Sequence, residues 1–234
     1  PPILRLEGAA AGYDGRAVLK RLDLRIDQDD RIALLGRNGQ GKSTLAKVLA
    51  DRLALMEGRR IAAPKLRIGY FAQHQLDELR ADETPLAHLA RLRPDEAPPR
   101  HRARLAGFGL HAAQADTEVA RLSGGQKARV GIARAIALEP KLLILDEPTA
   151  ALDVSIQALV LNLLVDLRAQ MGMSYLFVSH DLNVVRLLCD EVLVMKQGEI
   201  VDRGPTVTVM DNPSHPYTRA LIDAAPQPPE PVAA

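Results

Sequence analysis

The sequence lacks tryptophan, has few aromatic side chains and contains a single cysteine. Aromatic residues make up 3% of its 234 residues, and the one cysteine is Cys189. One cysteine excludes an intrachain disulfide framework and a cysteine-rich metal site, and we expect Cys189 to be a buried thiol at a helix end. No apolar run reaches the length of a membrane span, and no secretory signal precedes Ile3. These absences predict a cytosolic protein without direct membrane insertion.

The remaining composition is that of an ordinary globular protein. Hydrophobic residues make up 47% of the chain and charged residues 25%. The scarcity of aromatics means that the core must be built from Leu, Ile, Val and Ala. A formal net charge of +1 argues against a strong electrostatic binder of nucleic acids. A chain of this length is expected to form one large domain, or one domain with a small lobe.

A glycine-rich segment lies between a predicted strand, residues 31–35, and a predicted helix, residues 42–53. Residues 36–43 read Gly-Arg-Asn-Gly-Gln-Gly-Lys-Ser, the pattern G-x-x-x-x-G-K-S. The glycines allow a tight turn whose N–H groups, with the positive end of the helix, form a nest for phosphate oxygens. Lys42 can reach the β- and γ-phosphates, and the Ser43 hydroxyl suits Mg²⁺. The segment predicts nucleotide binding rather than a simple turn before a helix. The predicted ATP-binding residues here are Gly36, Arg37, Asn38, Gly39, Gln40, Gly41, Lys42, Ser43 and Thr44.

Two acidic residues follow a second apolar strand, predicted over residues 142–145. This strand ends in Asp146 and Glu147, and nucleotide phosphates lie at the carboxyl ends of strands in α/β folds. Asp146 would hold Mg²⁺, directly or through water. Glu147 would polarise a water for in-line attack on the γ-phosphate. The alternative is a strand that ends in a solvated Asp-Glu-Pro turn.

A second glycine-led helix start repeats the anion-binding pattern of residues 36–43. It reads Leu-Ser-Gly-Gly-Gln at 122–126, with Ser123 placed to cap the helix. One nucleotide does not need two such sites in one chain, and the simpler alternative is a capped helix with a flexible entry. Beside the phosphate loop and the acidic pair, however, this pentapeptide resembles the signature of the ATP-binding cassette (ABC) ATPases. The resemblance extends over nearly the whole chain.

The order of elements and the resemblance together predict the fold. Strands that alternate with helices indicate an α/β protein. The resemblance implies a P-loop NTPase of the ABC ATPase type, with a mainly parallel sheet core, an N-terminal antiparallel β subdomain and an inserted helical lobe. We expect one ATPase domain over residues 1–225, the lobe at about 76–138, a loop at 8–15 and a Pro-rich disordered tail at 226–234.

The resemblance also implies a head-to-tail dimer that encloses two Mg²⁺–ATP. Each ATP would lie between the phosphate loop of one subunit and residues 122–126 of the other. Tyr13 matches the aromatic residue that stacks on adenine, and Gln73 matches the glutamine that contacts Mg²⁺ and the attacking water. Asp153 matches the loop that crosses the dimer interface, and His180 matches the histidine that contacts the γ-phosphate. The implied site comprises catalytic Glu147, His180 and Gln73; Mg²⁺ ligands Ser43, Gln73 and Asp146; and, from the second subunit, Leu122, Ser123, Gly124, Gly125, Gln126 and Asp153.

The two halves of the chain resemble different groups of ABC ATPases. Up to about Arg129 the sequence looks like the F-type proteins, which are soluble translation factors, and the matching segments are 35–39, 69–74 and 125–129. From about Val130 it looks like the ATPases of dipeptide and oligopeptide importers, through segments 148–157, 174–182 and 212–221. The chain is therefore a mosaic of the two groups.

The mosaic leaves alternative functions open. We expect the energy-coupling ATPase of a peptide-type importer, paired with a second copy or a paralogous subunit and with a membrane permease. Such a subunit is cytoplasmic or peripheral on the inner face of the cell membrane. The alternative is a soluble F-type ATPase that acts on the ribosome through an arginine-rich lobe, although a solvated helix face is the favoured interpretation of those arginines. A module that binds ATP without hydrolysing it is disfavoured by Glu147 and His180. The lobe arginines are Arg91, Arg93, Arg100, Arg102 and Arg104.

Overall fold

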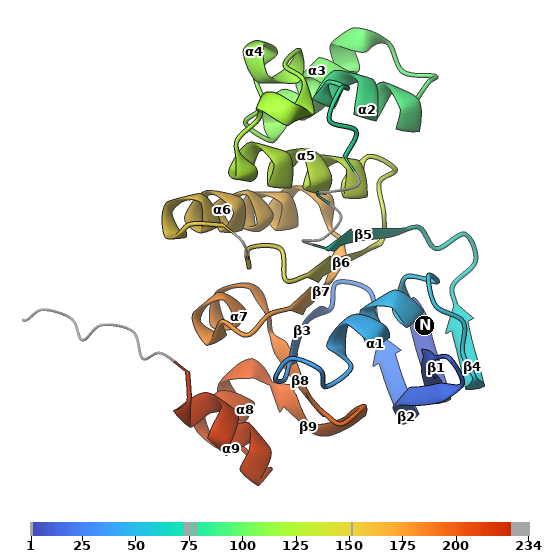
Figure 1. Cartoon of the computed structure of the whole chain (residues 1–234). Helices are drawn as coiled ribbons and strands as arrows, with labels where there is room; N and C mark the ends of the chain where they lie inside the picture. Colours follow the sequence, from blue (N-terminus) through green and yellow to red (C-terminus); the bar gives the residue numbers. More distant parts are fainter. Residues whose placement is uncertain (1, 73–75, 77–78, 151, 226–234) are drawn as a thin grey trace, which may run out of the picture. The chain divides into compact units, whose positions relative to one another are not determined.

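The computed structural model describes residues 2–72, 76, 79–150 and 152–225 (Figure 1). The described residues fall into two compact units, and each is considered by itself. The middle unit comprises residues 27–29 and 62–175, and the terminal unit comprises residues 2–26, 30–61 and 176–225. In chain order the elements are β1 (Leu4–Tyr13), β2 (Arg16–Ile26), β3 (Arg31–Leu35), α1 (Lys42–Leu49), β4 (Glu57–Ala62), β5 (Ile68–Ala72), α2 (Pro85–Leu92), α3 (Pro98–Gly107), α4 (Ala112–Ala115), a 3₁₀ helix η2 (Val119–Arg121), α5 (Gly124–Ile136), β6 (Leu142–Asp146), α6 (Val154–Met171), β7 (Ser174–Val178), α7 (Leu182–Leu188), β8 (Glu191–Lys196), β9 (Glu199–Pro205), α8 (Thr206–Asp211) and α9 (Pro216–Asp223).

The terminal unit contains an antiparallel sheet and the strand that leads into the glycine-rich segment. β1 and β2 pair antiparallel, and the sheet has the order β2-β1-β4. β3 pairs in parallel with β8, with Leu35 opposite Val194, and β8 pairs antiparallel with β9. β7 begins in the middle unit and ends in this one, where the strand order is β7-β3-β8-β9. The predicted N-terminal antiparallel subdomain is thus confirmed.

The predicted loop at 8–15 is wrong, because β1 continues to Tyr13. The pairing of β1 with β2 is irregular between Leu6 and Gly12, and Gly8 has a positive φ of 54°. Such bulges let a strand absorb extra residues without losing its partner. The turn is only the short connection between β1 and β2, which contains Gly15.

The middle unit combines parallel strands with the inserted helices. β5 and β6 pair in parallel, with Ala72 opposite Asp146, and the strand order in this unit is β5-β6-β7. Helices α2, α3 and α4 gather beside α5 (Figure 1). The Thr84 hydroxyl caps α2 by accepting a hydrogen bond from the Ala87 N–H at 3.2 Å, and Pro85 begins that helix. These elements confirm a mainly parallel α/β fold with a helical insert.

β3 and β6, the strands that lead to the predicted site residues, consist mainly of buried aliphatic residues. Residues 32–35 of β3 and 142–145 of β6 are at most 1% exposed. Phe71 and Phe177 are also fully buried, so the core is aliphatic with a few aromatic exceptions. Burial of each large side chain contributes about 1.5–3 kcal/mol to the free energy of folding. The packed core therefore holds the ends of β3 and β6 in fixed positions within their own units.

Some helix boundaries differ from the predictions. α1 ends at Leu49 rather than residue 53, and Asp51 beyond it has a left-handed φ of 61°. Two helices, α8 and α9, follow β9. Cys189 is buried directly after α7, as predicted. Among the described residues, no helix combines the length and the apolar character needed to cross a membrane.

Candidate nucleotide site

The segment between β3 and α1 adopts backbone conformations that favour glycine. Gly36, Gly39 and Gly41 have φ values of 151°, 78° and 104°. A Cβ atom at Gly36 would lie 2.5 Å from the Met195 carbonyl oxygen. Gly41 is the N-cap of α1 and supplies no side chain to cap the first N–H groups of the helix. Glycine thus permits both the turn and the uncapped helix start, an arrangement suited to phosphate oxygens.

The Lys42 side chain folds over this segment. Lys42 is 5% exposed, and its Nζ donates hydrogen bonds to the carbonyl oxygens of Gly36 at 2.7 Å and Arg37 at 3.2 Å. Thr44 is buried as well, whereas Ser43 is exposed in the first turn of α1. A cation held on the loop is placed to meet the phosphates that the loop would bind.

Two further predicted residues belong to the same unit. Tyr13 ends β1 with 43% of its surface exposed, and the Lys47 ammonium of α1 lies 5.7 Å from the centre of its ring. His180 is exposed just after β7. The preceding residue, Ser179, donates its backbone N–H to the Leu34 carbonyl at 3.4 Å. Since Leu34 lies two residues before the loop, His180 follows β7 at the same strand end from which the loop leaves β3.

The acidic pair lies at the end of β6 in the middle unit. Asp146 is 5% exposed, and its Oδ2 accepts a hydrogen bond from the Tyr70 hydroxyl at 3.3 Å. Glu147 has a left-handed φ of 50°. Seven other described residues that are not glycine, Glu139 among them, also have a positive φ, so this conformation alone does not assign a function. Gln73 lies outside the described residues.

The predicted signature segment forms a self-capped start of α5. The Ser123 N–H donates to Gln126 Oε1 at 2.9 Å, and the Gln126 N–H donates to the Ser123 hydroxyl oxygen at 3.3 Å. This reciprocal pair is a capping box. Leu122 is buried, while Ser123 and Gly124 are exposed. The cap named in the simpler alternative is therefore present, while its flexible entry stays a prediction.

The structure brings the signature segment next to the predicted interface loop. A Cβ atom at Gly125 would lie 2.3 Å from Ile156 Cγ2, and one at Gly124 would lie 3.7 Å from Leu152. Asp153, between these two partners, caps α6 by accepting the Ile156 N–H on Oδ1 at 3.0 Å. The starts of α5 and α6 thus pack against each other, a proximity that the spacing along the chain did not predict.

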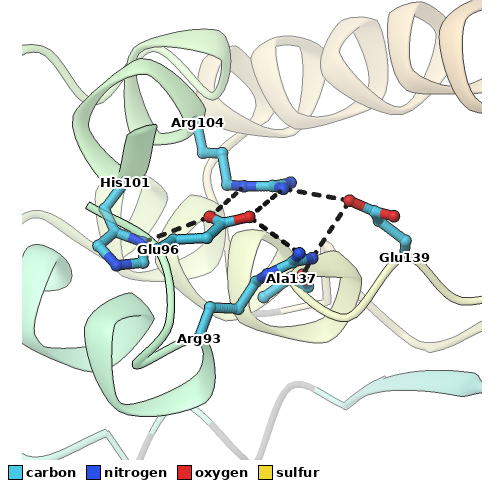
Figure 2. Close-up of polar contacts among 6 residues, drawn as sticks. All are labelled: Arg93, Glu96, His101, Arg104, Ala137 and Glu139. Atoms are coloured by element: carbon cyan, nitrogen blue, oxygen red, sulfur yellow. Dashed lines mark hydrogen bonds and ion pairs between the residues drawn. The ribbon is translucent and has the colours of Figure 1, made fainter. Parts of the chain in front are cut away.

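Most of the lobe arginines contact carboxylates in the middle unit. Figure 2 shows Arg104 donating to both oxygens of Glu96 at 3.1 and 3.0 Å, with Arg93 on the same carboxylate and Glu139 bridging the two arginines. The hydrogen bonds from Arg104 hold the pKa of Glu96 below its ordinary value. Arg102 forms a similar double contact with Asp116, and Arg91 pairs with Glu83.

One residue that contacts the loop was missed. The Tyr217 hydroxyl of α9 accepts a hydrogen bond from the backbone N–H of Arg37 at 2.9 Å. Its segment, 212–221, resembles importer ATPases, but that resemblance does not indicate a contact with the loop. No local pattern could reveal this contact, because 180 residues separate its partners.

The fold and the loop define an α/β P-loop protein, and the family follows from comparison with known proteins. The profile of the family described as ABC transporter matches residues 19–150, which is more than half of the chain. The chain therefore belongs to the ABC transporter family, as its ATP-binding domain.

Named relatives refine this assignment. The probable ATP-binding protein YheS of Escherichia coli K12 is 41% identical over 199 residues, or 85% of this chain and 31% of that protein. The oligopeptide transport ATP-binding protein OppD of Mycobacterium tuberculosis is 40% identical, over 88% of this chain and 37% of that protein. The chain thus spans about a third of the length of these two relatives. The probable D,D-dipeptide transport ATP-binding protein DdpF of E. coli K12 is 36% identical, over 88% of this chain and 69% of that protein.

Solved structures agree with the fold. The chain matches cbiO1 of Clostridium perfringens, described as part of the ABC transporter complex cbiONQ, with a TM-score of 0.78 and 31% identity over 90% of this chain and 91% of that one. It also matches a bacterial Atm1-family ABC exporter, solved with ATP bound, with a TM-score of 0.81 and 25% identity over 97% of this chain and 42% of that one.

Proposed function

We propose that this chain is a Mg²⁺-dependent ATPase domain, spanning residues 1–225, that drives a peptide-type ABC transporter as a head-to-tail dimer. The observation that carries the ATPase assignment is the phosphate loop, in which three glycines have positive φ and the buried Lys42 donates hydrogen bonds to the Gly36 and Arg37 carbonyls. The exporter with the same fold is solved with ATP. The peptide assignment is supported by the names of OppD and DdpF and by the sequence segments shared with importer ATPases.

The predicted metal ligands have the chemistry that Mg²⁺ requires. Asp146 places a buried carboxylate at the end of β6, and Ser43 places a hydroxyl in the first turn of α1. Mg²⁺ prefers such oxygen ligands and usually shares them with substrate phosphates. We assign Ser43, Asp146 and Gln73 to the metal, which would neutralise charge on the phosphoryl oxygens when it is bound.

The remaining residues supply binding and proton transfer. Lys42 holds the β- and γ-phosphates, and Tyr13 stacks on the adenine. Glu147 takes a proton from water as the water oxygen attacks the γ-phosphorus, and the bond from that phosphorus to the leaving ADP oxygen breaks. His180 donates a hydrogen bond to the γ-phosphate and helps to orient the water. Catalysis is then chiefly positioning and charge stabilisation.

The second subunit completes the site in this proposal. Residues 122–126 and Asp153 would face the γ-phosphate held by the other copy. Their support is the close approach of Gly124 to Leu152 and of Gly125 to Ile156, which brings residues 122–126 next to Asp153. ATP turnover measured against protein concentration tests the dimer, because a composite site gives second-order dependence. A constant specific activity down to very low concentration would contradict it.

The transport role is favoured over the ribosome alternative. That alternative rested partly on arginines of the lobe, and several of them are already paired with carboxylates, as Arg104 is with Glu96. We propose that the domain lies on the inner face of the cell membrane, bound to a permease. Affinity purification from detergent-solubilised membranes tests this: recovery of a permease supports transport, whereas ATP-dependent co-sedimentation with ribosomes instead would support the alternative.

A further inference from the structure

The phosphate loop contacts the last helix of the described chain. The backbone N–H of Arg37, the residue after Gly36, donates to the Tyr217 hydroxyl at 2.9 Å. Both partners belong to the terminal unit. Tyr217 is half-buried, and the Lys196 ammonium lies 5.3 Å from the centre of its ring. The hydroxyl and the ring are therefore each held by a separate contact.

A buried carboxylate fixes the segment that carries Tyr217. Asp202 of β9 is 7% exposed and accepts hydrogen bonds from the Ser214 N–H at 3.1 Å, the Ser214 hydroxyl at 2.7 Å and the His215 N–H at 3.1 Å. Burial alone would raise the pKa of Asp202, but these hydrogen bonds outweigh it and the pKa lies below its ordinary value. The ionised Asp202 carboxylate therefore holds the residues that begin α9.

The N-cap of α9 fixes the backbone position of Tyr217. His215 is the N-cap of α9, and its Nδ1 accepts the Tyr217 N–H at 3.0 Å. Pro216 occupies the first turn, where its fixed φ suits a helix. The backbone of Tyr217 is thus defined by its own cap, independently of the contact with Arg37.

The turn between β8 and β9 holds the other end of the loop. The Gln197 N–H donates to Gln40 Oε1 at 2.7 Å, and the Gly198 N–H donates to the Gln40 carbonyl at 3.0 Å. The loop is consequently supported at Arg37 by α9 and at Gln40 by this turn. A loop that is already ordered loses less conformational entropy when it binds a ligand.

We propose that Tyr217 is a positioning residue for the nucleotide, acting through Arg37 to hold the entry of the phosphate loop in its binding conformation. This inference rests on the proposed ATPase function. Under this proposal α9 contributes to the affinity for the nucleotide. Tyr217 does not act on the reacting atoms, so its effect falls on binding rather than on the chemical step.

The test compares Tyr217→Phe with Tyr175→Phe in the full chain. Both changes remove one phenolic oxygen; the Tyr175 hydroxyl is buried and has no hydrogen-bond partner among the described residues. We expect Tyr217→Phe to weaken Mg²⁺–ATP binding roughly two- to tenfold, the equivalent of one neutral hydrogen bond. Its KM for ATP should rise while kcat and the melting temperature stay near those of the parent. Tyr175→Phe should leave the affinity unchanged.

Amide hydrogen exchange in the nucleotide-free protein provides a readout independent of activity. Tyr217→Phe should accelerate exchange in a peptide containing Arg37, whereas Tyr175→Phe should not. If the parent binds no nucleotide, the proposed function fails, and the exchange rates still decide whether Tyr217 orders the loop. Parent-like affinity and parent-like exchange in Tyr217→Phe would overturn the inference, as would a fall in kcat at unchanged affinity.

Discussion

The starts of α1 and α5 look alike in sequence but are built differently. Each has glycines and a serine near the first turn of a helix. At α1 the N-cap is Gly41, in a left-handed conformation with no side-chain cap, and Lys42 sits over the loop carbonyls. At α5 the N-cap is Ser123, whose hydroxyl accepts the Gln126 N–H within a complete capping box. One helix start has no side-chain cap, whereas the other caps its first turn with its own side chains.

Because their N-caps differ, we expect the starts of α1 and α5 to have different roles. The α1 start has the backbone shape and the cation of a primary phosphate site. The α5 start is already stabilised, and Gly125 allows it to pack against Ile156 of α6. A stable, exposed helix end of this kind suits an approach from outside, such as the proposed second subunit. The two segments should therefore respond differently to substitution.

The largest expected effect is that of Glu147→Gln, which removes the proposed proton acceptor and keeps the shape of the side chain. Turnover should fall by about 10²–10⁴-fold, while ATP binding persists and an ATP-bound dimer accumulates. Phosphate release at saturating ATP and light scattering after gel filtration measure the two outcomes. Glu139→Gln is the matched control, because Glu139 shares the left-handed φ and belongs to the ion-pair cluster of Arg93 and Arg104 rather than to the proposed nucleotide site. Parent-like turnover in Glu147→Gln would refute the assignment.

Lys42→Ala should have the next largest effect. It removes the cation of the α1 start, and charge-assisted contacts to phosphate are the strong ones. We expect binding of Mg²⁺–ATP to weaken by about 100-fold or more, at the limit of detection by calorimetry. Lys20→Ala changes an exposed lysine of the same unit and should bind as the parent does. Retention of affinity in Lys42→Ala would remove the contrast between the two helix starts.

Gly125→Ala probes the packing behind the α5 start. The added Cβ would meet Ile156 Cγ2 at 2.3 Å, so we expect a loss of about 1–3 kcal/mol in the free energy of unfolding. Urea unfolding measures it. Gly107→Ala, at a helical glycine with nothing within 4 Å of the new atom, should cause no loss. Equal stability of both variants would contradict the close packing of Gly125 against Ile156.

Ser123→Ala should have the smallest effect on stability. Loss of an N-cap hydroxyl costs about 1 kcal/mol, and Ser155→Ala in the exposed first turn of α6 serves as the control. Nucleotide binding by dilute protein should remain that of the parent, because α1 is unchanged. Turnover at high concentration should fall if Ser123 acts across the dimer. A fall in affinity at high dilution would instead place Ser123 in the same site as Lys42.

The local features could be predicted because short-range sterics and hydrophobicity specify them. The glycine spacing predicted the loop, and the apolar runs before Gly36 and Asp146 predicted buried strands. The predicted loop at 8–15 failed because pairing with β2 draws β1 through Gly8 by means of bulges. The arginines of the lobe were ambiguous in sequence, since only folding brings Glu139 to Arg93 and Arg104.

By itself, the sequence determined which backbone positions can turn and which strands are buried. Gly36 and Gly41 can adopt their positive φ values because they lack a Cβ, and the continuous apolar segments need the interior of a sheet. Only the tertiary structure decided that Gly125 lies against Ile156 and that Tyr217 supports Arg37. Those contacts join residues far apart in the chain, so they arise from the packing of whole elements rather than from any local preference.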